Sequence, residues 1–170
     1  MSQRSMAPTK RICLIAHDNL KDSMLEWAHY NRGTLARHAL FATGTTGALL
    51  EQELGLEVSR FASGPLGGDQ QVGAAIVEDR LDLLVFFWDP LEPHPHDVDV
   101  KALLRVAVAY NIPVACNRAT ADFLLSSPLL DGTYDRDVLS TSQMATASSE
   151  ARRVARRSEG GERSSLGGRA

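Results

Sequence analysis

The chain has 170 residues, a formal net charge of −3, 44% hydrophobic residues and 23% charged residues. This length fits one domain with a sizeable core, and the small net charge gives no general attraction to nucleic acid or to anionic membranes. No apolar run approaches the length of a membrane span, and the first ten residues lack the apolar stretch of a secretion signal. Cys13 and Cys116 lie in apolar runs, so we expect reduced core thiols and a cytoplasmic location.

Short apolar runs alternate with helical patterns along most of the chain. The runs typical of buried strands are residues 11–16, 38–43, 57–63, 81–88 and 112–117. Apolar residues at helical spacing predict helices over residues 19–30, 44–54, 70–79, 97–111 and 119–126. Strands that alternate with helices predict an α/β fold, a three-layer α/β/α sandwich around a five-stranded parallel sheet.

Both ends of the chain differ in character from this middle part. We expect residues 1–10 to be a flexible leader and residues 11–130 to form the folded domain. Residues 131–170 read as a disordered tail rich in Ser, Arg and Gly, because the stretch from residue 140 has few large apolar side chains.

Polar or glycine-rich segments follow four of the predicted strands. They are residues 17–18, 43–46, 63–69 and 89–99. Because parallel sheets bind ligands beyond the carboxyl ends of their strands, these segments should meet on one rim.

The loop GPLGGDQQ (64–71) combines glycines with one carboxylate, Asp69, where the next helix should begin. Glycines allow a sharp turn with exposed N–H groups, and a helix start favours anions. Asp69 is either a simple helix cap or a catalytic base.

Two further segments suit a phosphate group. The turn Thr43-Gly44-Thr45-Thr46-Gly47 places hydroxyls and N–H groups at a helix start, although a plain helix cap would look the same. Neither a Walker loop nor a dinucleotide-type G-x-G-x-x-G after the first strand is present. Lys21 follows His17-Asp18 by one helical turn and could face the same rim as a point charge, or remain a surface lysine.

The segment His94-Pro95-His96-Asp97-Val98-Asp99 admits two interpretations. In extended backbone both histidines point the same way, and an aspartate could add oxygen to a metal site. No further His or Cys cluster completes a zinc set, so we favour a single acid–base histidine over a metal ligand. Together with Asp69, this equipment suits removal of a proton beside a carbonyl in a small phosphorylated substrate.

These motifs resemble those of methylglyoxal synthase. The resemblance rests on AHD (16–18), ATGTTG (42–47), SGPLGGDQQVGA (63–74), FFWDPL (86–91) and PHDVDVKALLR (95–105), and it runs from about residue 10 to 128. It implies a metal-free lyase of homohexameric assembly that converts dihydroxyacetone phosphate into methylglyoxal and inorganic phosphate. It also implies that inorganic phosphate inhibits the enzyme and acts as an allosteric signal.

The resemblance also implies roles for individual residues. Asp69 matches the base that forms the enediolate, His96 the histidine that handles protons on the substrate oxygens, and Asp99 an acid that supports the site. The implied substrate and phosphate contacts are His17, Asp18, Lys21, Thr43, Gly44, Thr45, Thr46, Ser63, Gly64 and His96. His94 matches no family position and is expected to be a solvent-facing loop histidine.

The C-terminal region departs from the family, whose members end in a shorter segment with a basic residue that relays phosphate regulation. The Ser/Arg/Gly-rich tail does not align with it, so no arginine inherits that role. Two other functions stay open at this point. One is a non-catalytic effector-binding module, like the regulatory domain of carbamoyl phosphate synthetase, and the other is a metal-dependent hydrolase built on His94, His96 and Asp99.

Overall fold

The computed structural model describes residues 2–91 and 97–139. A parallel sheet in the order β4-β3-β2-β5-β6 forms the centre of the molecule, which confirms the predicted five-stranded parallel sheet. Its strands are β2 (Arg11–Ala16), β3 (Ala39–Ala42), β4 (Val58–Arg60), β5 (Leu83–Phe87) and β6 (Val114–Ala115).

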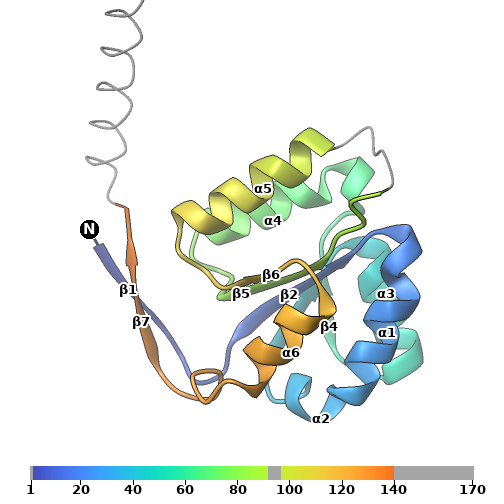
Figure 1. Ribbon diagram of the computed structural model, residues 1–170, viewed down its shortest axis with the longest axis horizontal. Helices are drawn as coiled ribbons and strands as arrows, with labels where there is room; N and C mark the ends of the chain where they lie inside the picture. Colours follow the sequence, from blue (N-terminus) through green and yellow to red (C-terminus); the bar gives the residue numbers. More distant parts are fainter. Residues whose placement is uncertain (1, 92–96, 140–170) are drawn as a thin grey trace, which may run out of the picture.

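Helices cover both faces of this sheet, so the three-layer sandwich is confirmed. In Figure 1, α4 (Gly68–Val77) and α5 (Asp97–Ala109) lie together on one face. The helices on the opposite face are α1 (Lys21–Tyr30), α2 (Arg32–Leu35), α3 (Gly44–Leu54) and α6 (Arg118–Ser126). None of the described helices has the length and apolar character needed to cross a bilayer.

Alternation along β2 shows why the two faces are both apolar. Ile12 and Leu14 are fully buried in the core under α1 and α3, whereas Cys13 and Ile15 belong to the second core under α4 and α5. Successive side chains of a strand point to opposite faces, so a strand buried on both sides must be apolar throughout. The continuous run of β5 has the same explanation, because all its residues are buried.

The predicted leader is wrong for residues 2–6, and the predicted tail is wrong for residues 134–138. Ser2–Met6 forms β1 and pairs antiparallel with β7 (Tyr134–Val138), with Ser2 opposite Val138. This two-stranded ribbon projects from the sheet in Figure 1. Its strands lie at opposite ends of the chain, so their local sequences carry little sign of the pairing. Residues 140–170 lie outside the described residues.

A cut after residue 139 should leave a folded protein. Residues 140–170 contain only Met144, Val154 and Leu166 as large apolar side chains, which is too few to add to a core. We expect the thermal midpoint to stay within about 2 °C of the full chain, an order-of-magnitude limit for a neutral change. A matched cut after residue 132 removes β7 and should lower the midpoint clearly. Insoluble protein after the first cut would contradict this expectation.

His38 connects the start of β2 to the loop before β7. The Lys10 N–H donates to His38 Nδ1 (3.1 Å), and His38 Nε2 lies 3.8 Å from an Asp131 carboxylate oxygen. Burial lowers the pKa of His38 below its usual 6.5, with Arg37 and Lys10 acting in the same direction and Asp131 opposing them.

Because the unfolded chain then binds a proton more readily than the folded chain, stability should fall as the pH drops below about 6.5. Urea unfolding of the protein at pH 7 and pH 5 measures this loss. The variant His38→Asn keeps an oxygen acceptor for the Lys10 N–H but cannot titrate, so its stability should change less between these pH values. An equal change in both proteins would refute the assignment to His38.

Candidate active site

A cavity of about 320 Å³ opens where β2, β3 and β5 end. Most of the predicted substrate contacts line it, together with Asp69, and they are His17, Asp18, Lys21, Thr43, Thr45, Ser63 and Gly64. The structure therefore gathers predicted residues that are separated by up to 52 positions in the sequence, from His17 to Asp69. The loops after parallel strands meet at this rim, as the topology requires.

His17 follows the last residue of β2 and is held by the loop after β5. Its backbone N–H donates to Phe87 O (3.1 Å), and its Nδ1 accepts a hydrogen bond from the Asp89 N–H (3.1 Å). Its ring also packs edge-on against Phe86, with 5.1 Å between the centroids. Since Nδ1 accepts, a neutral His17 carries its proton on Nε2 and can donate from there.

Lys21 is the first residue of α1, and it brings a positive charge to the cavity. Its ammonium group contacts an Asp18 carboxylate oxygen at 2.5 Å, one helical turn earlier. Only 18% of the Lys21 side chain is exposed, whereas the Asp18 side chain is 85% exposed. An ammonium held at the cavity wall by a solvent-exposed carboxylate can exchange this partner for a phosphate oxygen.

The threonine turn begins α3 as the sequence predicts. Thr43 is the residue that precedes the helix, in extended conformation, and its side chain does not cap the helix. The Gly44 N–H donates to Ala62 O (3.2 Å), which joins this turn to the loop after β4. Thr45 lines the cavity and is exposed, so its N–H and hydroxyl are placed for an anion at the helix start.

Two predicted contacts in this turn do not line the cavity. Thr46 is 2% exposed, and its hydroxyl has no hydrogen-bond partner among the described residues. Gly44 leaves little room for a side chain, because a Cβ built on it would lie 3.1 Å from Ser63 N. The close approach of the two loops therefore explains the glycine.

The loop after β4 places Asp69 by a compact sequence of turns. Ser63 O accepts hydrogen bonds from the N–H groups of Leu66 and Gly68, both at 3.0 Å. Gly67 then takes a left-handed conformation (φ +93°), which favours glycine, and α4 begins at Gly68. Asp69 lies in the first turn of α4, where the partial positive charge of the helix start stabilises a carboxylate.

Asp69 is close to both a backbone segment and a buried thiol. A Cβ built on Gly64 would lie 3.5 Å from one of its carboxylate oxygens, which is van der Waals contact, so the acid lies directly against the backbone of this loop. Burial, and to a lesser extent the charge of Asp69, raises the pKa of Cys13 far above its usual range. Cys13 therefore stays a neutral thiol and is no candidate nucleophile.

The remaining predicted residues are placed differently. Asp99 does not line the main cavity but a second hollow of about 240 Å³ between α4 and α5, which Asp69 also borders. His94 and His96 lie outside the described residues, so the structure does not test their proposed roles. Within residues 2–91 and 97–139, no group of three His, Cys, Asp or Glu side chains could hold a metal ion.

The sequence pattern did not point to the apolar wall of the cavity. This wall consists of Ile15, Ala16, Pro65, Phe86 and Val100. All but Pro65 lie in strands or helices that the apolar pattern assigns to the core. Their position at strand ends or at a helix start is the sequence feature that could have indicated this wall.

The chain matches a family model and many curated relatives. The family model described as the MGS-like domain matches residues 23–116, more than half of the chain. The methylglyoxal synthase of Leptospira interrogans is 56% identical over 140 residues, which cover 82% of this chain and 95% of that protein. The chain belongs to the methylglyoxal synthase family. The methylglyoxal synthase of Proteus mirabilis is 60% identical over 126 residues, 74% of this chain and 83% of that protein.

A solved structure agrees with this assignment. The crystal structure of the methylglyoxal synthase from Elizabethkingia anophelis has a TM-score of 0.79 and 49% sequence identity, and it covers 82% of this chain and 92% of that one. The resemblance read from the motifs is therefore confirmed, and so is the methylglyoxal synthase-like fold. These relatives favour neither the effector-binding module nor the metal-dependent hydrolase.

Proposed function

We propose that this chain converts dihydroxyacetone phosphate into methylglyoxal and inorganic phosphate, with Asp69 as the base. The observation that carries the proposal is the placement of Asp69, Lys21 and Thr45 around one cavity of about 320 Å³. A carboxylate then faces the same space as a cation and a helix start. The membership of this chain in the methylglyoxal synthase family supports the same reaction.

In the first step, an Asp69 oxygen removes a proton from the hydroxymethyl carbon of the substrate. The electron pair of that C–H bond forms a carbon–carbon double bond with the carbonyl carbon, and the carbonyl oxygen takes up the negative charge. The Nε2–H of His17 suits a hydrogen bond to this oxygen, because His17 lines the cavity. From the family resemblance we assign proton transfer between the two substrate oxygens to His96 and its support to Asp99.

In the second step, the enediolate expels phosphate from the neighbouring carbon. The terminal oxygen forms an aldehyde, the double bond moves toward the phosphate-bearing carbon, and the C–O bond to phosphate breaks. The product is the enol of methylglyoxal, which takes up a proton on its CH₂ carbon. Elimination prevails over reprotonation when the breaking bond stands perpendicular to the enediolate plane. We assign the grip that sets this angle to Lys21 and the start of α3, because both line the cavity and suit a phosphate group.

The family resemblance supports further proposals about assembly and control. We infer a homohexamer that inorganic phosphate inhibits, and a cytoplasmic location for an enzyme that needs no metal or organic cofactor. Phosphate competes for the same Lys21 and Thr45 groups that hold the substrate ester, which gives inhibition a physical basis.

The proposal is tested by incubating the purified protein with dihydroxyacetone phosphate, without added metal and with a chelator present. We expect methylglyoxal and phosphate in equal amounts. Phosphate release that the chelator abolishes would instead favour a metal-dependent hydrolase. Binding of inorganic phosphate without any turnover would favour an effector-binding module.

A further inference from the structure

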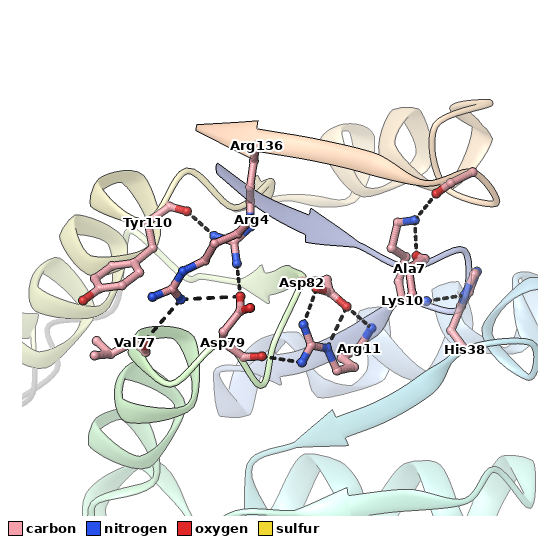
Figure 2. A network of polar contacts seen from close by, with 11 residues as sticks. Arg4, Ala7, Lys10, Arg11, His38, Val77, Asp79, Asp82, Tyr110 and Arg136 are labelled. Carbon is pink, nitrogen blue, oxygen red and sulfur yellow. Dashed lines mark hydrogen bonds and ion pairs between the residues drawn. The ribbon is translucent and has the colours of Figure 1, made fainter. Parts of the chain in front are cut away.

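We propose that the β1–β7 ribbon is a clamp on the carboxyl ends of α4 and α5, and that its Arg136 is a positioning residue for the acids at the other ends of these helices. The inference rests on the proposed function, because Asp69 and Asp99 are assigned to catalysis there. Figure 2 shows the ribbon residues reaching down onto the ends of both helices.

The first set of contacts holds the end of α4. Arg136 Nη2 lies 2.5 Å from an Asp79 carboxylate oxygen, two residues beyond the end of this helix. Arg4, from the other strand of the ribbon, donates from Nη1 to Val77 O (3.4 Å) and lies 3.5 Å from the same Asp79 oxygen. Both strands therefore contribute a guanidinium group to one helix end (Figure 2).

The second set holds the end of α5. The other terminal nitrogen of Arg136, Nη1, donates to Tyr110 O, the residue after α5. Asn111 Nδ2 donates to Asp137 O of β7 (3.1 Å), and the Arg4 guanidinium lies 5.5 Å from the centre of the Tyr110 ring. A single arginine thus bridges the two helix ends, where the partial negative charge of each helix favours a cation.

The backbone conformation of Asp79 and Asn111 indicates that these two positions serve the contacts of their side chains with the ribbon. Among the described residues, the non-glycine residues with positive φ are Asp79 (φ +59°) and Asn111 (φ +51°). Glycine is the favoured residue for a left-handed turn after a helix. At each helix end the chain has instead a polar side chain that binds the ribbon, at some cost in backbone strain.

Burial makes the clamp sensitive to the loss of a partner. The Arg136 side chain is 1% exposed, and its Nε has no hydrogen-bond partner among the described residues. Burial also lowers the pKa of Arg136 below its usual value, and the charge of Asp79 opposes this shift. A buried guanidinium needs its acceptors, so Asp79 and Tyr110 O fix its place.

The two site carboxylates, Asp69 and Asp99, lie at the opposite ends of the clamped helices. Asp69 is in the first turn of α4 and Asp99 in the first turn of α5, and the ten residues of α4 span about 15 Å. A helix transmits a shift along its axis as a nearly rigid rod. By contrast, Lys21 and Thr45, the proposed phosphate-binding residues, lie on α1 and α3. The clamp interactions described above involve neither of these helices. Losing the clamp should therefore impair proton removal more than substrate binding.

The test compares Arg136→Met with Arg37→Met, a matched control in which the lost arginine is 57% exposed and pairs with Asp131. For Arg136→Met we expect kcat per folded molecule to fall about tenfold, given how steeply rate depends on positioning. KM should stay within twofold, and Arg136→Lys should recover part of kcat. With substrate deuterated at the hydroxymethyl carbon, the kinetic isotope effect on kcat should rise, which a smaller folded fraction cannot cause. Arg37→Met should resemble the parent protein in all three readouts.

Two further measurements keep the test decisive. Amide hydrogen exchange needs no substrate, and Arg136→Met should exchange faster at the first turns of α4 and α5 but not at that of α3. This separates failure of the clamp from failure of the proposed function.

If Arg136→Met does not fold, Asn111→Gly removes the Asp137 contact while relieving the left-handed turn, and it should lower kcat two- to threefold with KM unchanged. Unchanged kcat, isotope effect and exchange in the folded variant would overturn the clamp.

Discussion

Replacing Asp69 by asparagine should abolish turnover of dihydroxyacetone phosphate, with a loss of at least about a thousandfold, as expected when a general base is removed. The amide has nearly the same shape as the carboxylate but cannot accept the proton. Lys21 and Thr45 are unchanged, so inorganic phosphate should still bind with an affinity close to that of the parent. Kinetics with coupled detection of methylglyoxal, together with calorimetry for phosphate, measure both quantities.

Asp22→Asn is the matched control for this substitution. Asp22 lies in the first turn of α1, is exposed and does not line the cavity. The same loss of one carboxylate there should leave kcat within twofold of the parent. If Asp69→Asn kept a near-normal rate, Asp69 would not be the base. If it lost phosphate binding as well, its role would be to shape the loop.

Gly68→Ala should both destabilise the protein and lower its activity. A Cβ at this position would overlap Ala62 O and lie 2.9 Å from the carbonyl carbon of Ser63, so the backbone must move to admit it. Such overpacking costs about 1–3 kcal/mol in the free energy of unfolding. Because the next residue is Asp69, the shift should also displace the carboxylate that we propose as the base and lower kcat by at least about tenfold.

Gly73→Ala provides the control within the same helix. A Cβ on Gly73 meets nothing within 4 Å, and alanine stabilises a helix interior relative to glycine by about 0.5–1 kcal/mol. This variant should therefore be as stable as the parent or more stable, with unchanged kcat. Urea unfolding and activity assays on the two variants check the contrast. Equal behaviour of both would mean that the close approach at Gly68 is unimportant.

Local sequence patterns were sufficient to predict most of the fold, because the strands and helices of the core follow the apolar spacing typical of their type. Helix α3 begins and ends at the predicted residues, since Gly55 takes the left-handed conformation (φ +59°) that ends it. The run 81–88 marks β5 because both its faces are buried. By contrast, the four-residue helix α2 contains Gly33 and is too short for a helical period to show.

The ribbon could not be predicted, because its stability comes from contacts between distant parts of the chain. Ser2–Met6 has one buried residue, Met6, and Arg136 is a charged residue that sequence statistics place on the surface. Only the acceptors at Asp79 and Tyr110, far away in sequence, make its burial possible. A pattern within a short window contains no record of such partners.

The site was predicted in part for a similar reason. Residues after strands were predicted to meet at the rim, and Asp69, His17 and Lys21 do line one cavity. Motifs do not tell whether a small polar residue faces the ligand or the protein, so they do not indicate that Thr46, one of the substrate contacts that the resemblance implies, is buried. Asp99 lines the hollow between α4 and α5 and not the main cavity. This placement depends on how the two helices pack, which the spacing of motifs along the sequence does not specify.

The central claim is that Asp69 faces the reacting carbon of a substrate whose phosphate is held by Lys21 and the start of α3. The most direct measurement is a crystal structure with a phosphorylated hydroxamate that mimics the enediolate. We predict an Asp69 carboxylate oxygen about 3–3.5 Å from the atom that replaces the reacting carbon, with the phosphate against Lys21 and Thr45. A carboxylate turned away from the mimic, with another group in its place, would contradict the claim.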